Sequence, residues 1–449
     1  MSRTALDLND AAILAWQDGQ VVLCDVGYAA LENDGLSFGA SAFVAARLRP
    51  RAANRRYWRD LADAPMAQPM GTCRSTADLA HAHLLRIVPQ LQPGGADVVI
   101  VVPAYWDAGQ TGLALGLAQD AGLTVSGLVD SAIAASRRPC PARELWHLDL
   151  TLHEVILSRI RQNDMATLDQ RHRLDGLGVE RLDRAAAQCM ARAFLKTSRF
   201  DALQHAESES ALYGRLAEWL AQLRRTESRE LALDFGGHTF TAVMPPSELR
   251  DVIARTCEPL VQRLRTLVSA RTPAVLQIPE RLAQFPGALE VLSGLSNWEI
   301  LVLEPAASAR GALRVRAQDA SAGLQLLTAL PWDQPAVAEA KGTPAREVPR
   351  PTHVLYGHQV FRLGETPLQV GLDLPLGEPG LSVPAATTGV SRRHCTLQIE
   401  DGQVLVHDHS RYGTTLNGHR VDGSAVLHAG DVLRFGTPAQ QLILVRETE

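Results

Sequence analysis

The chain has 449 residues, of which 46% are hydrophobic and 21% are charged, and its formal net charge is -5. This length suits two or three domains, and the composition is ordinary for a globular protein. The acidic balance argues against a nucleic-acid partner, and no apolar stretch approaches the ~20 residues of a membrane-inserted helix. Because the first residues lack the charged start and apolar core of a secretory signal, we expect a cytoplasmic protein.

The six cysteines are widely separated and include no C-x-x-C pair. This spacing predicts neither a disulfide framework nor a zinc site. We therefore expect reduced thiols, most of them buried, and no bound metal.

The first part of the chain alternates strand and helix patterns. Strands are expected at residues 5–8, 12–16 and 20–25, and helices around residues 41–48 and 75–91. Residues 97–102, DVVIVV, form a continuous apolar run that is typical of a strand buried on both faces. A helix at residues 108–121 and a strand at residues 124–129 follow. This order predicts an α/β domain with parallel strand pairing.

The middle of the chain contains two predicted hairpins and two long helical stretches. The hairpins are expected at residues 145–161 and 230–243, and the helices at residues 178–221 and 246–269. Residues 333–352 are rich in proline, alanine and charge, which is the composition of a moderately stiff linker.

Arginines and aromatic residues are mixed in the segment RLRPRAANRRYWR at residues 47–59. Such mixtures also occur in proteins that bind single-stranded nucleic acids. Because the chain as a whole is acidic, we interpret this segment as a solvated face or a protein-docking patch.

The most specific pattern lies at residues 390–436, where SRRHC, SRYGTTLNG and LHAGDVLRFG are set among alternating strands. Residues 395–400 alternate apolar and polar side chains, as a half-buried strand does. The pairs Asp-Gly and Asn-Gly at residues 401–402 and 417–418 suit tight hairpin turns. Ser391 and residues 410–412 therefore fall on loops at strand ends, where hydroxyl and guanidinium groups suit a doubly negative phosphate.

These motifs resemble the signature of a forkhead-associated (FHA) domain, and the resemblance covers residues 353–449. It implies an all-β sandwich of eleven strands that recognises phosphothreonine in a protein partner. By this resemblance, Ser391 hydrogen-bonds the phosphate, Arg392 and Arg411 line the pocket, and Tyr412 contacts the peptide backbone. Further residues are implied to be structural: Gly371, His394, Asp408, Gly413, Asn417 and Gly418.

The chain departs from the FHA pattern at one position in the implied pocket. The family usually has Gly-Arg where this chain has Gly371-Leu372, and that arginine normally grips the phosphate. The loss of a charge-assisted hydrogen bond costs about 1.5–3 kcal/mol, or about 10- to 150-fold in affinity. Arg411 is a candidate to compensate for it.

Residues 1–332 resemble the DnaK-type (seventy-kilodalton) heat-shock chaperones, whose ATPase domain has the actin-like (ribonuclease H-like) α/β fold. Residues 99–136 carry this resemblance. LGVERLD at residues 177–183 and EPAASARGA at residues 304–312 are similar to two further motifs of that family.

The nucleotide-binding loops of that family have lost their glycines here. DLGTT in the family reads DLNDA at residues 7–11, DLGGGT reads DLTLHE at residues 149–154, and GGSS falls near QIPE at residues 277–280. Glycines let several backbone amides approach the phosphates. We therefore expect a pseudo-ATPase domain without ATP or Mg²⁺, in which Asp7 and Asp149 remain as a vestigial nucleotide site.

Together these features predict an adaptor or scaffold with an inactive chaperone-like domain and an FHA domain that docks a protein, with no nucleic acid bound. Two alternatives fit the sequence as well. One is a divergent ATP-dependent chaperone regulated through its FHA domain. The other is a structural subunit that binds its partner without phosphate.

Overall fold

Two units make up the chain in the computed structural model: residues 1–339, the N-terminal unit, and residues 340–449, the C-terminal unit. The structure describes residues 3–32, 35–91, 97–224, 229–269, 271–315, 324–336, 350–357, 359–372, 374, 380–384, 387–400, 402–417 and 419–446.

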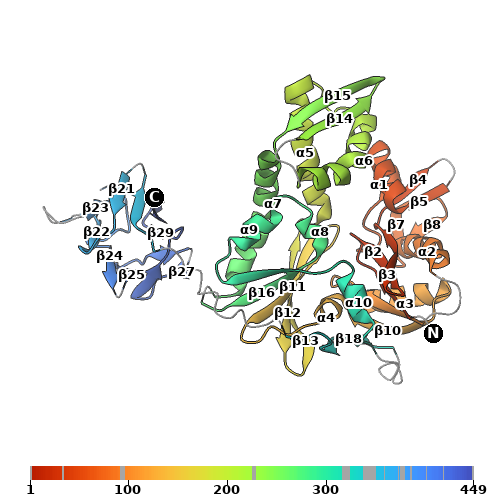
Figure 1. The fold of residues 1–449 in the computed structure, drawn as a ribbon, viewed down its shortest axis with the longest axis horizontal. Coiled ribbons are helices and arrows are strands. Elements are labelled where there is room, and N and C mark those ends of the chain that lie inside the picture. Colours follow the sequence, from red (N-terminus) through yellow and green to blue (C-terminus); the bar gives the residue numbers. More distant parts are fainter. Residues whose placement is uncertain are drawn as a thin grey trace. The chain divides into compact units, whose positions relative to one another are not determined.

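Two six-stranded mixed sheets carry the N-terminal unit (Figure 1). The strand order is β18-β10-β9-β1-β2-β3 in the first sheet and β17-β16-β11-β12-β13-β19 in the second. Each sheet starts with three consecutive antiparallel strands, β1 to β3 or β11 to β13. Two later strands, β9 and β10 or β16 and β17, then run parallel to the first of the three. The two sheets therefore repeat one topology.

The strands of both sheets are short and mostly buried. The first sheet contains β1 (Arg3–Asp7), β2 (Ile13–Gln17), β3 (Gln20–Asp25), β9 (Asp97–Val102), β10 (Val125–Asp130) and β18 (Leu326–Leu327). The second contains β11 (Glu144–Leu150), β12 (Glu154–Gln162), β13 (Met165–Asp175), β16 (Ala274–Ile278), β17 (Trp298–Val302) and β19 (Ala329–Pro331). Smaller sheets are formed by β4 (Ala29–Glu32), β5 (Gly35–Phe38) and β6 (Ala53–Asn54), by β7 (Pro65–Met70) and β8 (Cys73–Ser75), and by β14 (Arg229–Phe235) and β15 (His238–Met244).

Helices fill the connections between these strands. They are α1 (Gly39–Leu48), α2 (Thr76–Ile87), α3 (Ala108–Asp120), α4 (Ser131–Ala135), α5 (Val179–Ser198), α6 (Ala206–Leu223), α7 (Pro246–Leu267), α8 (Glu280–Ala283), α9 (Ala288–Ser293) and α10 (Ala307–Ala312). Capping boxes start two of them, Ser75 with Asp78 at α2 and Asp107 with Gln110 at α3. In each box the two side chains satisfy amides that the first turn leaves free.

Separate apolar cores support the two halves of the N-terminal unit. The first sheet packs against α2 and α3, and the second packs against α5, α6, α7 and α9. A third cluster, which includes Val99, Val129 and Val275, joins strands of the two sheets. The predicted buried strand at residues 97–102 is confirmed as β9, which is central in the first sheet.

The beginning of the predicted linker is held by the N-terminal unit. The carboxylate of Asp333 accepts hydrogen bonds from Arg137 at 2.7–3.2 Å, and Gln334 Oε1 accepts from Arg138 at 2.5 and 2.8 Å. Residues 337–349, which make up most of that segment, lie outside the described residues.

The C-terminal unit is a β-sandwich of two sheets. One contains β21 (Gln359–Arg362), β20 (His353–Tyr356), β30 (Gln440–Val445), β29 (Val432–Phe435), β26 (Thr415–Leu416) and β27 (His419–Arg420) in that order. The other contains β23 (Gly380–Ser382), β22 (Leu368–Gly371), β24 (Cys395–Glu400), β25 (Gln403–Asp408) and β28 (Ser424–Leu427). Side chains from both sheets, among them Val354, Leu433, Val370 and Val406, interlock in one buried core.

Neither membrane spans nor disulfides are found in the structure. Among the described residues, no helix is long and apolar enough to cross a membrane. All six cysteines are free, and all but Cys24 are buried.

Candidate functional site

Three strand ends of the C-terminal unit bring the predicted phosphate-binding residues together. Ser391 lies just before β24, and Arg411 lies in the loop after β25. The Arg411 backbone amide donates to Ser391 Oγ at 3.3 Å. The backbone oxygen of Ser391 in turn accepts from the Leu372 amide at 3.3 Å, after the end of β22. Residues that are distant in sequence therefore meet at one edge of the sandwich.

His394 holds these loops from inside the domain. Its side chain is 0% exposed, and its ring lies 4.6 Å from that of Phe435. The Ser391 amide donates to His394 Nδ1 at 3.1 Å. Burial lowers the pKa of His394, so the imidazole is neutral and Nδ1 is free to accept this bond.

Asp408 holds the loop that carries Arg411 and Tyr412. Its carboxylate accepts hydrogen bonds from the amides of Ser410 and Thr414 and from the Thr414 hydroxyl, each at 3.0 Å. Burial alone would raise the pKa of Asp408, but the hydrogen bonds from Ser410 and Thr414 outweigh it and the pKa is lowered. The charge of Asp408 is thus engaged within its own loop.

Other predicted structural residues fix the backbone around this edge. A Cβ atom at Gly371 would lie 1.8 Å from the carbonyl oxygen of Arg392, so only glycine fits there. Asn417 adopts a φ of 51°; it donates to Asp431 Oδ1 at 2.7 Å and accepts from the Val432 amide at 2.9 Å. Gly418 lies outside the described residues.

The implied ligand contacts are at the surface. Arg392 and Arg411 are exposed, and Tyr412 is 68% exposed with the Arg411 guanidinium 5.9 Å from its ring centre. Neither arginine forms an ion pair with any carboxylate in the described part of the chain. Leu372, in contrast, packs against the apolar core of the sandwich.

The comparison with known families falls on this part of the chain. Residues 378–436 match the family model of the FHA domain. The C-terminal unit therefore contains an FHA domain, which is a protein-interaction module. The match covers all four residues predicted to contact a ligand, whereas Gly371 and Leu372 lie just before it. No curated protein matches the chain.

Asp7 and Asp149, the predicted vestigial nucleotide site, lie on the first strand of each repeated sheet, and protein groups occupy both. Asp7 accepts from the Ser308 hydroxyl, and burial raises its pKa to about 6. Asp149 accepts from Ser131 Oγ at 2.6 Å, and one of its oxygens lies 3.5 Å from His147 Nε2. Burial would raise the pKa of Asp149, but His147 and Ser131 outweigh it and the pKa is lowered.

The loops that follow these two aspartates are bonded to each other. Asp10 is fully buried, and one of its carboxylate oxygens accepts from the Leu152 amide at 2.8 Å. Arg281 donates to the carbonyl oxygen of Leu150 at 2.6 and 2.9 Å. Within the described residues, no group of three or more His, Cys, Asp or Glu side chains is placed to hold a metal ion.

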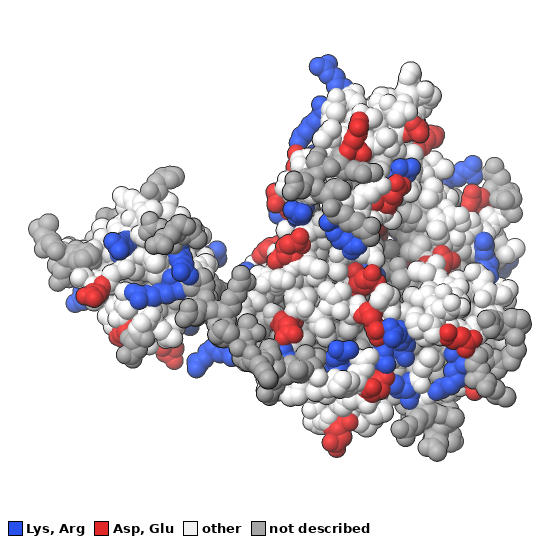
Figure 2. All heavy atoms as spheres, in the orientation of Figure 1, with Lys and Arg blue, Asp and Glu red and all other residues white. Residues whose placement is uncertain are grey.

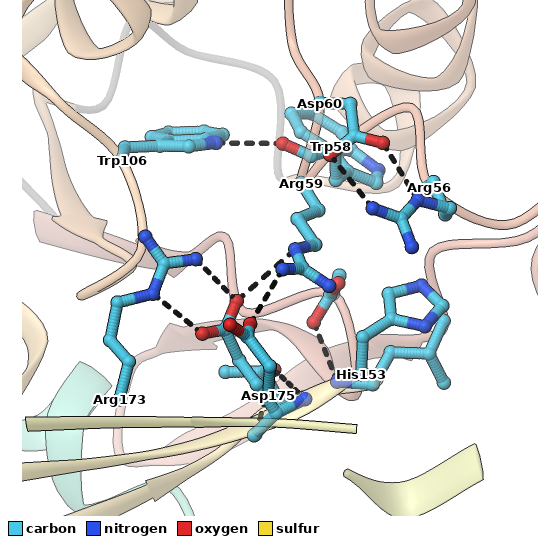
Figure 3. Close-up of polar contacts among 12 residues, drawn as sticks. Arg56, Trp58, Arg59, Asp60, Trp106, His153, Arg173 and Asp175 are labelled. Atoms are coloured by element: carbon cyan, nitrogen blue, oxygen red, sulfur yellow. Dashed lines mark hydrogen bonds and ion pairs between the residues drawn. The ribbon is translucent and has the colours of Figure 1, made fainter. Parts of the chain in front are cut away.

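Two arginines of the segment at residues 47–59 cross between the halves of the N-terminal unit (Figure 3). Arg59 lies 3.2 Å from the buried carboxylate of Glu154 and 2.9 Å from that of Asp175. Arg55 lies 2.7 Å from the carboxylate of Glu180. We call these ion pairs the arginine clasp. The expectation of a solvated face or a docking patch is therefore wrong for Arg55 and Arg59.

Aromatic residues of the same segment anchor the clasp to the first half. Tyr57 and Trp58 are buried, and the Tyr57 hydroxyl lies 2.6 Å from His83 Nδ1. Trp106 Nε1 donates to the carbonyl oxygen of Trp58 at 2.7 Å (Figure 3). The sequence pattern of alternating arginine and aromatic residues indicated this segment, but not which acidic residues it would meet.

Proposed function

We propose that the chain is a cytoplasmic adaptor or scaffold whose FHA domain docks a protein partner through a phosphothreonine. The N-terminal unit acts in this proposal as an actin-like, chaperone-like pseudo-ATPase that serves as a platform for protein interaction. One observation carries the proposal. Ser391, Arg392 and Arg411 lie on two loops joined at one edge of the sandwich, and no described carboxylate neutralises the two arginines.

The geometry supports a direct role for Ser391 in phosphate binding. Its oxygen accepts from the Arg411 amide, so its hydroxyl hydrogen is available to a phosphate oxygen. The guanidinium groups of Arg392 and Arg411 supply the charge that such an anion needs. Tyr412, exposed beside Arg411, is in place to contact the backbone of a bound peptide.

The repeated topology of the two sheets supports the actin-like part of the proposal. An actin-like domain consists of two ribonuclease H-like halves, and the strand order of the two sheets is what such a duplication requires. Asp7 and Asp149 occupy equivalent strands of the two halves, as the chaperone resemblance implies.

The residues between these halves do not fit a magnesium–nucleotide complex. Where the chaperones offer free backbone amides to phosphates, the Leu152 amide is bonded to the Asp10 carboxylate. A buried carboxylate at that point would repel a triphosphate, and the side chains of residues 151–154 occupy the space that glycines leave open. We therefore infer that this unit keeps its fold without nucleotide chemistry.

Leu372 favours one alternative, a structural subunit that binds its partner without phosphate. It packs on the apolar core where the family usually places a phosphate-binding arginine. The first test below separates the two functions.

The variant Ser391→Ala tests the proposed phosphate contact. We expect phosphothreonine-peptide binding by the full chain to weaken by about 10- to 150-fold, because a charge-assisted hydrogen bond is lost. Calorimetric titration measures the change. Ser424→Ala, which changes an exposed serine on β28, is the matched control and should bind like the wild type. Unchanged affinity in Ser391→Ala would favour the structural subunit.

Titration of the full chain with ATP and Mg²⁺ tests the pseudo-ATPase. We expect no saturable heat or fluorescence change, because the loops after Asp7 and Asp149 are occupied by protein groups. Saturable binding that Asp149→Asn abolishes would favour the divergent ATP-dependent chaperone instead.

A further inference from the structure

Arg420 lies against the loop that carries Arg411 and Tyr412, although it belongs to a different strand. It ends β27 and is paired with Thr415 of β26. Gly413 has a φ of 95°, and a Cβ atom placed on it would lie 3.0 Å from Arg420 Nε and 3.3 Å from Nη2. The guanidinium of Arg420 therefore rests on the backbone of the loop, in space that a side chain at position 413 would fill.

This guanidinium is exposed and has no acidic partner among the described residues. The nearest carboxylate along the chain, that of Asp422, is also exposed and forms no ion pair with Arg420 in the described structure. Asp408, inside the same loop, is occupied by Ser410 and Thr414. Arg420 thus adds an uncompensated positive charge next to those of Arg392 and Arg411.

Three unpaired arginines therefore border Ser391, in a domain where Leu372 has replaced an arginine of the pocket. Figure 2 shows arginine side chains over the visible face of the C-terminal unit. A single phosphate group has too few oxygens at its exposed side to engage three guanidinium groups on two loops and a hairpin. A second anionic group on the ligand would pair with the outermost of them.

We propose that Arg420 forms a subsite for a carboxylate of the bound peptide, so that the FHA domain selects phosphothreonine segments flanked by acidic residues. This inference rests on the proposed function, because the peptide must first be held by its phosphate. The subsite contributes selectivity and salt-sensitive association, as charges at the rim of an interface do.

The experiment compares two phosphothreonine peptides of one sequence, with glutamate at the flanking positions in the first and glutamine in the second. Wild-type full-length chain is expected to bind the glutamate peptide about fivefold more tightly, which is what one partly exposed ion pair supplies. Arg420→Gln should remove this preference while binding the glutamine peptide as the wild type does. The preference should also shrink at high salt.

Arg362→Gln is the matched control, because Arg362 is exposed on β21, at the opposite edge of the same sheet. It should keep the full preference for glutamate. The inference is overturned if the wild type shows no preference, or if Arg420→Gln retains it. If the glutamine peptide binds and Ser391→Ala weakens that binding, the proposed function stands even when the subsite fails. If neither peptide binds, both fail.

Discussion

Replacing Glu154 with glutamine is expected to destabilise the N-terminal unit by about 3–5 kcal/mol, the cost of removing one partner from a buried ion pair. Glu154 is 0% exposed and lies 2.7 Å from Arg173 through each carboxylate oxygen, and 3.2 Å from Arg59. Glutamine has the same shape but no charge, so both guanidinium groups would lose the anion that balances them.

Hydrogen exchange of the full chain measures this effect in the strands of the N-terminal unit. Glu218→Gln is the control, because Glu218 pairs with Arg215 at the surface, where both side chains are about half exposed. Such a pair contributes about 0–1 kcal/mol. Equal protection in the two variants would show that the arginine clasp does not hold the halves together.

Replacing Gly371 with alanine is expected to disrupt the FHA domain and to abolish phosphopeptide binding. The added carbon would lie 1.8 Å from the Arg392 carbonyl oxygen and 3.2 Å from the Arg393 Cα. These are backbone atoms, so relief requires movement of the segment that carries Ser391. Overpacking costs about 1–3 kcal/mol, and we expect the upper end here because backbone must move.

Gly364→Ala is the matched control for this change. Gly364 belongs to the same unit, and a Cβ atom there would meet no atom within 4 Å. Hydrogen exchange in β24 and peptide titration should distinguish the variants, with Gly364→Ala close to the wild type. Normal exchange and normal binding in Gly371→Ala would contradict the packing described for β22.

Strands with a regular apolar pattern were predictable from the sequence. The alternation at residues 395–400 gives β24, and the run DVVIVV gives β9. Even so, Thr396 is buried on the face predicted to be exposed. It lies 3.1 Å from His409 Nε2 and 3.4 Å from Gln369 Oε1, two contacts that alternation alone does not reveal.

The strand β13 was not predicted, because its side chains are polar on both faces. Arg171 pairs with Asp130, and Arg173 pairs with Glu154. Acidic residues that are distant in sequence thus take the place of an apolar neighbour. Tertiary contacts of this kind leave no period in the sequence.

The single helix predicted at residues 178–221 is wrong, since the structure has α5 and α6 there. Arg199, with a φ of 55°, ends α5. The Asp201 carboxylate then accepts from the Leu203 amide at 3.0 Å, which forms a local turn. Asp201 was the available signal, because aspartate favours such turns over helix interiors.

The candidate site was largely predictable because its residues cluster in two short motifs at strand ends. Ser391, His394 and Asp408 are brought together with Arg411 in this way. Arg420 was missed because its relation to the site depends on the close approach of Gly413 across a hairpin. The arginine clasp was missed because Arg59 and Glu154 are far apart in sequence and meet only through the pairing of the two halves.

The most direct test of the central claim is a titration of the full chain with a degenerate phosphothreonine peptide library and with its unphosphorylated counterpart. We predict saturable binding of the phosphorylated library at least about tenfold tighter than that of the unphosphorylated one, from the loss of one or more charge-assisted hydrogen bonds. Equal affinity for the two libraries would contradict the assignment of Ser391, Arg392 and Arg411 to a phosphate-binding site.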